Sequence, residues 1–512
     1  MSATHLLSGE GLTIGLLRQL LTDQSRLALA PAAQERVAAS RAVVDRLQAG
    51  EKSYYGINTG FGALAHTRIA AADIEKLQEN LILSHAVGVG REVDPDIVRL
   101  MLLLKINALA LGLSGVRPVL VEYLLRFYNA GLSPVVFAKG SLGASGDLAP
   151  LAHLTLGLLG LGEVWQAGRK IPATDALASL GLAPLRLKSK EGLALINGTQ
   201  FMAAHAVHGL LRIRDLLKVA DLTAAMTLEA MRGSATPFDE RIHAARQHPG
   251  QQETADNVRR LLVDSQILPS HLNCGKVQDP YSLRCVPQVH GAVRDAVRHA
   301  ATTVETEINA VTDNPLVFPN GDVVSGGNFH GEPLAFALDY LAIATAELAS
   351  ISERRLYLLL GGDTMGEKKL PKLLMSDTGL NSGFMLPQYA AAALVSENKI
   401  LAHPASVDSI PSSLGQEDHV SMGAIAATKL LEVVANTETV LAIELMSAAQ
   451  ALDFIHPLKA GGGVEAAHAA VRQRLAFAEA DRLFHNDIQT ALGLVRDGTV
   501  VAAAEQVTGE LH

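Results

Sequence analysis

Residues 140–151 read Gly-Ser-Leu-Gly-Ala-Ser-Gly-Asp-Leu-Ala-Pro-Leu, and the tripeptide Ala144-Ser145-Gly146 inside this run can form a reactive group from its own backbone. In a tight bend, the amide nitrogen of Gly146 can attack the carbonyl carbon of Ala144. Loss of the ring water and of the Ser145 hydroxyl then leaves an imidazolone that carries an exocyclic methylidene. Glycine suits this position because its nitrogen is unhindered and its backbone angles are unrestricted. The product is a strong electrophile, which no side chain supplies, so the stretch predicts elimination chemistry on amines. A loop before a helix, with free N–H groups for an anion, is the alternative interpretation.

Composition limits the classes of protein that this chain can belong to. It has 512 residues, of which 48% are hydrophobic and only 4% aromatic, with a formal net charge of −9. This length can bury a large core and would usually divide into more than one domain. The negative balance, without a basic run, argues against nucleic acid as a partner. We therefore expect a protein with a large core that does not bind nucleic acid.

The sequence gives no sign of export or of a membrane span. Cys274 and Cys285 are too few for a disulfide framework, and the N-terminus lacks a basic region followed by an apolar stretch. The longest apolar run, 148–162, is interrupted by His153 and is too short to cross a bilayer. These observations predict a cytoplasmic protein that does not bind membranes.

Long proline-free stretches with helical spacing indicate a mainly α fold, a bundle of long helices. Apolar residues recur at Leu334, Leu338, Leu341 and Leu348, and residues 420–456 contain no proline. As one helix the second stretch would be about 50 Å long, and such alanine-rich helices are usually buried in a bundle. Glycine-rich segments concentrate before residue 200. We therefore expect an N-terminal region, 1–200, that carries the reactive loop, and a helical bundle over 201–512.

A tyrosine and a histidine stand next to glycine bends. The segment 54–62, Tyr-Tyr-Gly-Ile-Asn-Thr-Gly-Phe-Gly, places Tyr54 and Tyr55 before a bent backbone, where a phenol can face a cavity. A phenol with an ordinary pKa near 10 acts as a base near neutral pH only if its surroundings stabilise the phenolate. A tyrosine that packs the turn is the alternative, and the residues alone do not distinguish the two tyrosines. His85 precedes a second bend, at Gly88, where it could equally be a core or surface histidine.

Four further segments carry polar groups beside glycines or helix starts. Gln416-Glu417-Asp418-His419 offers two carboxylates and an imidazole, although acids before a helix also stabilise its N-terminus. Arg284, in 278–285, is of the type that binds carboxylates in a bidentate manner. Amides lie next to glycines in Asn197-Gly198-Thr199 and in 326–330, Gly-Gly-Asn-Phe-His.

Phosphate and metal sites are not favoured by the spacing of the motifs. The segment 361–368 begins like a phosphate loop but has Glu367 where the lysine belongs. His330-Gly331-Glu332 and Glu417-Asp418-His419 lack the spacing of a strong metal motif, so we expect no metal.

Taken together, the segments resemble the aromatic amino acid ammonia-lyases, and among them the histidine ammonia-lyases, over nearly the whole chain. Residues 140–151 are similar to the signature of the family's 4-methylideneimidazol-5-one (MIO) group, and 55–62 and 416–422 match further family motifs in order and separation. The resemblance implies a mainly α, ammonia-lyase-like fold, an MIO formed from Ala144, Ser145 and Gly146, and no external cofactor. It also implies a homotetramer whose active sites draw residues from three subunits.

The resemblance also assigns roles to single residues. Tyr55 corresponds to the proposed catalytic base, Asn197 to the amide that binds the MIO carbonyl, and Arg284 to the partner of the substrate carboxylate. Gln278 matches a residue beside the MIO, Tyr281 matches a catalytic residue that lines the site, and Phe329 matches a further lining residue. In members selective for histidine, the residues at the positions of His85 and Glu417 orient the imidazole. Gly415 departs from the asparagine of many relatives.

These matches predict non-oxidative deamination of L-histidine to trans-urocanate and ammonia, the first step of histidine degradation. A buried glutamate facing a phenyl ring would be left unpaired, whereas an imidazole can hydrogen-bond it, so Glu417 favours histidine. Attack of the substrate amine or of the imidazole ring on the MIO both remain open. The alternatives are a tyrosine or phenylalanine ammonia-lyase, an MIO-dependent 2,3-aminomutase, an elimination enzyme of the fumarase and aspartase type and a helical scaffold without activity.

Overall fold

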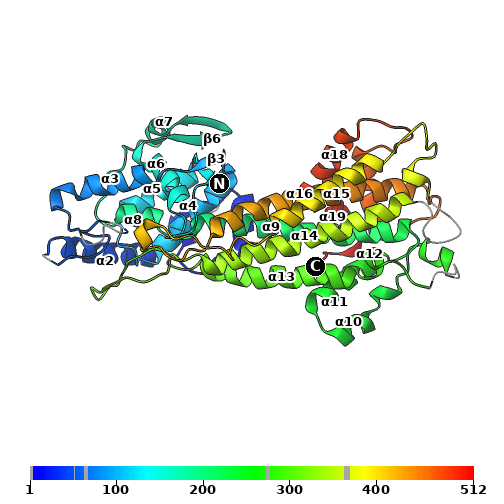
Figure 1. Cartoon of the computed structure of the whole chain (residues 1–512), viewed down its shortest axis with the longest axis horizontal. Coiled ribbons are helices and arrows are strands. Elements are labelled where there is room, and N and C mark those ends of the chain that lie inside the picture. The colour runs from blue at the N-terminus through cyan, green and yellow to red at the C-terminus, as the bar shows by residue number, and fades with distance from the viewer. Residues whose placement is uncertain (1–3, 51, 61, 63–66, 273–276, 362–369) are drawn as a thin grey trace. The chain divides into compact units, whose positions relative to one another are not determined.

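The computed structural model describes residues 4–50, 52–60, 62, 67–272, 277–361 and 370–512. Phe61, Cys274 and residues 362–368 of the segment that begins like a phosphate loop lie outside the described residues. Within the described chain, helices account for most of the structure (Figure 1), and the prediction of a mainly α fold is confirmed.

The backbone groups into two compact units, each assembled from three segments of the chain. Unit 1 comprises Met1–Gly209, Ala300–Asp339 and Pro404–Thr428, and unit 2 comprises Leu210–His299, Tyr340–His403 and Lys429–His512. Two late segments of the chain thus belong with the N-terminal region. The single boundary expected near residue 200 stays a prediction.

Unit 1 combines short helices with small sheets. Its strands form a parallel pair, β1–β2, the antiparallel pairs β3–β5 and β8–β9, and an antiparallel sheet in the order β4-β6-β7. The helices are α1 (Ile14–Thr22), α2 (Pro31–Gln48), α3 (Ile74–His85), α4 (Pro95–Ala110), α5 (Pro118–Asn129), α6 (Leu148–Leu156), α7 (Ala173–Ser179) and α8 (Glu191–Ile196), with short 3-10 turns. The strands are β1 (Thr4–Leu7), β2 (Arg26–Leu29), β3 (Val89–Glu92), β4 (Ser133–Pro134), β5 (Phe137–Lys139), β6 (Glu163–Gln166), β7 (Arg169–Pro172), β8 (Leu316–Val317) and β9 (Val323–Val324).

Helix α4 forms the core of unit 1. Asp94 caps it by accepting the backbone N–H of Asp96 at 2.9 Å, and Pro95 occupies its first position, where a missing N–H is harmless. From Leu100 to Ala110 every residue is buried. A helix that is apolar all round must lie inside the protein, and the two polar exceptions, Lys105 and Asn107, both donate hydrogen bonds to backbone carbonyls.

Four long helices have residues in both units: α9 (Gln200–Ala230), α13 (Val286–Glu307), α14 (Glu332–Gly361) and α16 (Gly423–Asp453). The proline-free stretch 420–456 indeed contains a single long helix, α16. Unit 2 adds α10 (Glu240–Arg246), α11 (Pro249–Leu261), α12 (Tyr281–Arg284), α15 (Met385–Leu401), α17 (Gly462–Arg474), α18 (Phe484–Arg496) and α19 (Thr499–Thr508).

A buried polar network joins the long helices inside unit 2. Arg355 on α14 makes a bidentate ion pair with Glu444 on α16 (2.5 and 2.7 Å), and both side chains are fully buried. Glu444 also accepts the hydroxyl of Thr227 on α9. On α13, His290 bonds Asp221 of α9 at 2.7 Å. Because removing one partner would leave a buried charge unpaired, the network fixes how these helices align.

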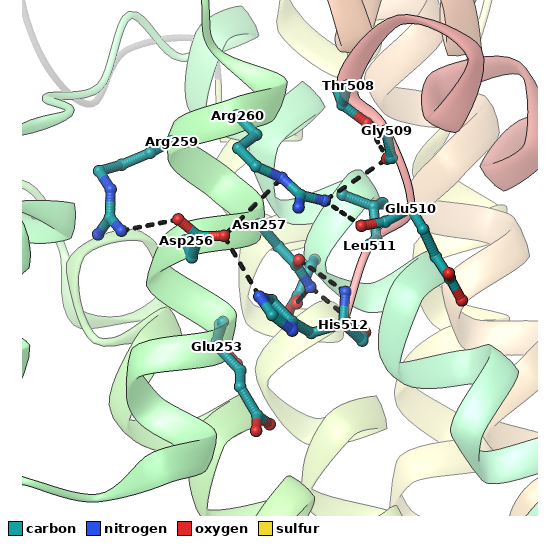
Figure 2. Close-up of polar contacts among 12 residues, drawn as sticks. Glu253, Asp256, Asn257, Arg259, Arg260, Thr508, Gly509, Glu510, Leu511 and His512 are labelled. Atoms are coloured by element: carbon teal, nitrogen blue, oxygen red, sulfur yellow. Dashed lines mark hydrogen bonds and ion pairs between the residues drawn. The ribbon is translucent and has the colours of Figure 1, made fainter.

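The last residues of the chain lie along α11 (Figure 2). Arg260 donates to the carbonyl oxygen of Glu510 at 2.5 Å, and His512 exchanges hydrogen bonds with Asn257. The His512 ring contacts Asp256 at 3.3 Å. These contacts hold the segment 509–512 in place beside α11.

Among the described residues, α14 is long and apolar enough to cross a membrane by length and composition. Two thirds (67%) of its most apolar window is nevertheless buried inside the protein. This burial is what the core helix of a bundle requires.

Candidate active site

Unit 1 contains a cavity of about 900 Å³ that collects most of the site residues expected from the sequence. Those that line it are Tyr55, His85, Ala144, Ser145, Asn197, Phe329 and Glu417. They come from loops and helix ends of all three chain segments that form unit 1. The cavity therefore exists only in the folded unit.

The loop that carries Ala144-Ser145-Gly146 runs from β5 to α6 and is sharply bent. Ala144 and Gly146 form a backbone bridge to each other, and Gly146 forms a second bridge to Gly198. Gly146 has φ +74°, and a Cβ atom there would lie 2.2 Å from the carbonyl oxygen of Gly198. Only glycine fits both the backbone angle and the close approach.

Asn197 holds the bend from the other side. The residue follows α8 in an extended conformation, and its Nδ2 donates to the carbonyl oxygen of Ser145 at 2.7 Å. The backbone N–H of Asp147 donates to Gly198 at 2.7 Å. The segment 197–198 is thus hydrogen-bonded to the reactive loop at Ser145 and at Asp147, on both sides of Gly146.

Glu417 lies directly against the reactive tripeptide. One of its carboxylate oxygens accepts the Ser145 hydroxyl at 2.9 Å, and the other accepts the Ser412 hydroxyl at 3.0 Å. Sequence reasoning misses Ser412, because a single serine in a loop carries no distinguishing signal. It orients the carboxylate by occupying the oxygen that Ser145 does not use.

The Tyr55 phenol is held in its neutral form. Its oxygen accepts the backbone N–H of Gly62 at 3.4 Å. Burial raises the pKa of Tyr55 above its ordinary value, the negative charge of Glu417 raises it further, and the Gly62 N–H opposes both effects. Tyr55 therefore needs a change in its surroundings before it can accept a proton at neutral pH.

His85, the last residue of α3, is also neutral. Its Nδ1 lies 3.0 Å from the Ser84 hydroxyl. Burial lowers the pKa of His85, while the Leu81 carbonyl and the Glu417 carboxylate act in the opposite direction. The cavity thus presents a neutral imidazole and a neutral phenol near one carboxylate.

Two buried ionisable groups, Lys105 and Asp147, hold the backbone around the site. Lys105 donates to the carbonyl oxygens of Ala194 (3.2 Å) and Asn197 (3.0 Å), and burial lowers its pKa to about 7. Asp147 accepts the backbone N–H groups of Phe201 and Met202, and burial raises its pKa to about 7. Neither was predicted, although a lysine inside the apolar run of α4 is a signal that could have identified Lys105.

Gln278, Tyr281 and Arg284 do not line this cavity. They belong to unit 2, where the Arg284 guanidinium lies 4.8 Å from the centre of the Tyr281 ring. The Tyr281 side chain is exposed. Among the described residues that line the cavity, none is arginine or lysine.

The geometry fits the cyclisation that the sequence suggests. The bend brings the residues on either side of Ser145 together, Gly146 is the residue whose backbone nitrogen would attack, and Asn197 binds the carbonyl that would remain on the ring. The Asn197 Oδ1 atom is buried without a hydrogen bond. Such a site provides a hydroxyl to be eliminated, a donor for the ring carbonyl and a carboxylate facing the cavity.

Comparison with known proteins identifies clear relatives. The family described as Aromatic amino acid lyase matches residues 12–473. The chain is 54% identical to the histidine ammonia-lyase of Anaeromyxobacter sp. (strain K), covering 97% of this chain and 99% of that one. It is 50% identical to the histidine ammonia-lyase of Symbiobacterium thermophilum, over the full length of both.

Solved structures have the same fold. The histidine ammonia-lyase from Trypanosoma cruzi superposes with a TM-score of 0.90 at 42% identity, covering 99% of this chain and 96% of that chain. The tyrosine aminomutase from Streptomyces globisporus superposes with a TM-score of 0.93 at 34% identity, covering 100% of both chains.

Proposed function

Because this chain belongs to the aromatic amino acid lyase family and is an ammonia-lyase, we propose that it deaminates L-histidine to trans-urocanate and ammonia. The observation that carries the choice of substrate is Glu417, whose carboxylate faces the cavity beside Ser145. An imidazole N–H can donate to this carboxylate in a charge-assisted hydrogen bond. A phenyl ring would remove water from Glu417 and offer no donor in return.

We propose that Ala144, Ser145 and Gly146 form an MIO and that Asn197 binds its carbonyl. When formed, this group supplies an electrophilic carbon that activates the substrate toward loss of ammonia. The bend at Gly146 and the 2.7 Å contact from Asn197 to Ser145 support this assignment.

Tyr55 is proposed to take the β-proton at its phenolic oxygen. In the free protein the charge of Glu417 helps to raise the pKa of Tyr55. A substrate imidazole that donates to Glu417 offsets part of this charge and so weakens the smaller of the two causes that raise the pKa of Tyr55, the larger being burial.

We propose that the active site is shared between chains of a homotetramer. A substrate carboxylate requires a cation, and the described cavity lining has no arginine or lysine. Arg284 can meet this need from another chain, together with Gln278 and the exposed Tyr281. Co-expression of Ser145→Ala with Arg284→Ala should restore part of the activity that each variant lacks. Ser145→Ala with Tyr55→Phe is the matched control, because both residues line one chain's cavity, and it should restore none.

A cytoplasmic location is part of the proposal. It is supported by the low cysteine content of the sequence, which does not provide a disulfide framework.

The first experiment follows product formation in the near ultraviolet with L-histidine, L-tyrosine and L-phenylalanine offered separately. Urocanate from histidine alone is expected. Cinnamate or coumarate instead would overturn the role given to Glu417. The intact mass gives a second test, since the wild-type chain should be lighter than calculated by two waters and Ser145→Ala should not.

A 2,3-aminomutase is the second candidate, because the tyrosine aminomutase structure matches the whole chain with a TM-score of 0.93. Such an enzyme would transfer the amine from the α-carbon to the β-carbon. Formation of a β-amino acid in place of free ammonia would identify it.

A further inference from the structure

Two short motifs that are far apart in sequence converge on one wall of the cavity. Glu332 is the first residue of α14, His330 lies just before this helix, and His419 lies just before α16. The two histidine rings stack with centroids 5.7 Å apart and 26° between their planes. The ligand atoms of all three side chains lie within 4.8 Å of one another. All three belong to unit 1, and both histidines line the cavity.

We propose that His330, Glu332 and His419 bind a divalent transition-metal ion of the zinc class. Two imidazoles and one carboxylate form a ligand set that zinc uses with its fourth position open. The proposal concerns metal binding alone and does not depend on the proposed reaction.

The distances are compatible with one ion after small rotations. Ligand atoms around a tetrahedral zinc lie roughly 3.4 Å apart, given metal–ligand bonds of about 2.1 Å. The present spread of up to 4.8 Å therefore needs the most distant ligand atoms to approach each other by up to about 1.4 Å. His419 is exposed and contacts the His330 ring by stacking, so its ring can shift without disturbing a packed core.

The local hydrogen bonding leaves these ligands available. The Oε2 atom of Glu332 is buried without a hydrogen bond and lies 3.9 Å from Nδ1 of His330. That nitrogen accepts the backbone N–H of Glu332 at 3.3 Å, a long contact that is lost at small cost. A cation would satisfy the buried carboxylate oxygen, and Asp418 and Glu417 add negative charge to the cavity that both histidines line.

A second group of similar composition in unit 2 is less suited to a metal. Asp453, His456 and His468 lie equally close together. However, the two oxygens of Asp453 already accept bonds from His468 (2.9 Å) and from Arg472 (2.8 Å). A metal ion there would have to displace both and would be repelled by the Arg472 guanidinium.

The test uses the full-length protein after treatment with a chelator. Binding of Zn²⁺ is measured by titration calorimetry, and Co²⁺ serves as a spectroscopic probe because four-coordinate Co²⁺ absorbs strongly in the visible range. We expect one ion per chain. His419→Ala and Glu332→Gln should each raise the dissociation constant at least tenfold, whereas His485→Ala, an exposed histidine outside the group, should leave it unchanged.

Three results would overturn the proposal. They are the absence of stoichiometric binding, unchanged affinity in His419→Ala and Glu332→Gln, or loss of binding in His456→Ala. Thermal unfolding of the metal-free variants establishes that they are folded, and the exposed position of His419 predicts that its replacement leaves the melting temperature unchanged.

Discussion

Replacement of Gly146 by alanine tests whether the bend in the reactive loop depends on the close approach to Gly198. The added Cβ would lie 2.2 Å from the Gly198 carbonyl oxygen and 2.6 Å from its carbon, where real Cβ atoms are not found. The obstacle is backbone, so neither partner can rotate away. The loop must move, and the hydrogen bonds that flank the bend must lengthen.

Two contributions to the free energy of unfolding can be separated. The left-handed backbone of Gly146 (φ +74°) costs about 1–2 kcal/mol for a residue with a Cβ. The steric overlap adds roughly 1–3 kcal/mol, the usual cost of overpacking. Gly131 provides a matched control, because it has φ +65° and a Cβ atom added to it would meet nothing within 4 Å. Gly131→Ala should therefore show the first cost alone.

The assay is urea unfolding at one fixed protein concentration, combined with the intact mass of each variant. Gly146→Ala should be less stable than Gly131→Ala by about 1–3 kcal/mol, and its chain should retain the two waters that the proposed ring closure removes. Gly131→Ala should have the same deficit of two waters as the wild type. Equal stability of the two variants, with the ring formed in both, would refute the argument that Gly198 dictates the bend.

Three further substitutions probe the site and the interior. Tyr55→Phe should lower kcat by about 10²–10⁴-fold, the usual contribution of a positioned base, without affecting the loss of two waters; an unchanged kcat would remove Tyr55 from the reaction. Glu417→Gln should lower kcat/KM for L-histidine roughly 10- to 150-fold, because a hydrogen bond to a charged group contributes about 1.5–3 kcal/mol; steady-state assays in which histidine and phenylalanine lose activity equally would contradict its role in selecting the ring. In unit 2, burial raises the pKa of Glu229 from 4.5 to about 7, so this group contributes about 3 kcal/mol to the free energy of unfolding that is lost as the pH rises from 4.5 to 7. Glu229→Gln, which resembles the protonated form, should flatten this slope in urea titrations at each pH, and a slope as steep as that of the wild type would show that another group titrates.

The local parts of this structure could be predicted from the sequence, because their signals lie within a few residues. The proline-free run 420–456 predicts α16, and the leucine spacing from Leu334 onward predicts α14, since each pattern reflects one helix. The bent loop at 140–146 could be predicted because the run 140–151 resembles the MIO signature of the family and because glycine allows the backbone angles of a tight bend.

Associations between distant segments could not be predicted in the same way. Ser412 meets Glu417 and thereby the loop at Ser145, but nothing in its own neighbourhood marks it. Metal motifs are recognised by ligands spaced along one helix or turn, and His330 and His419 are 89 positions apart, so only the fold brings them together. Lys105 is the exception, since a charge in an apolar helix is visible in the sequence.

The contact between the reactive loop and the segment 412–422 sets the order of events during synthesis of the chain. The Leu142 carbonyl accepts the Met422 N–H at 3.0 Å, and Ser145 meets Glu417 only after more than 270 further residues have been added. Asn197 and Gly198, which hold the bend, follow soon after the loop in the sequence, whereas Glu417 and Met422 are added only when more than four fifths of the protein has been made. Because Glu417 accepts the Ser145 hydroxyl that the proposed ring closure removes, we expect this closure to wait for Glu417, so that a nascent chain would not yet carry the electrophile that cellular amines and thiols attack.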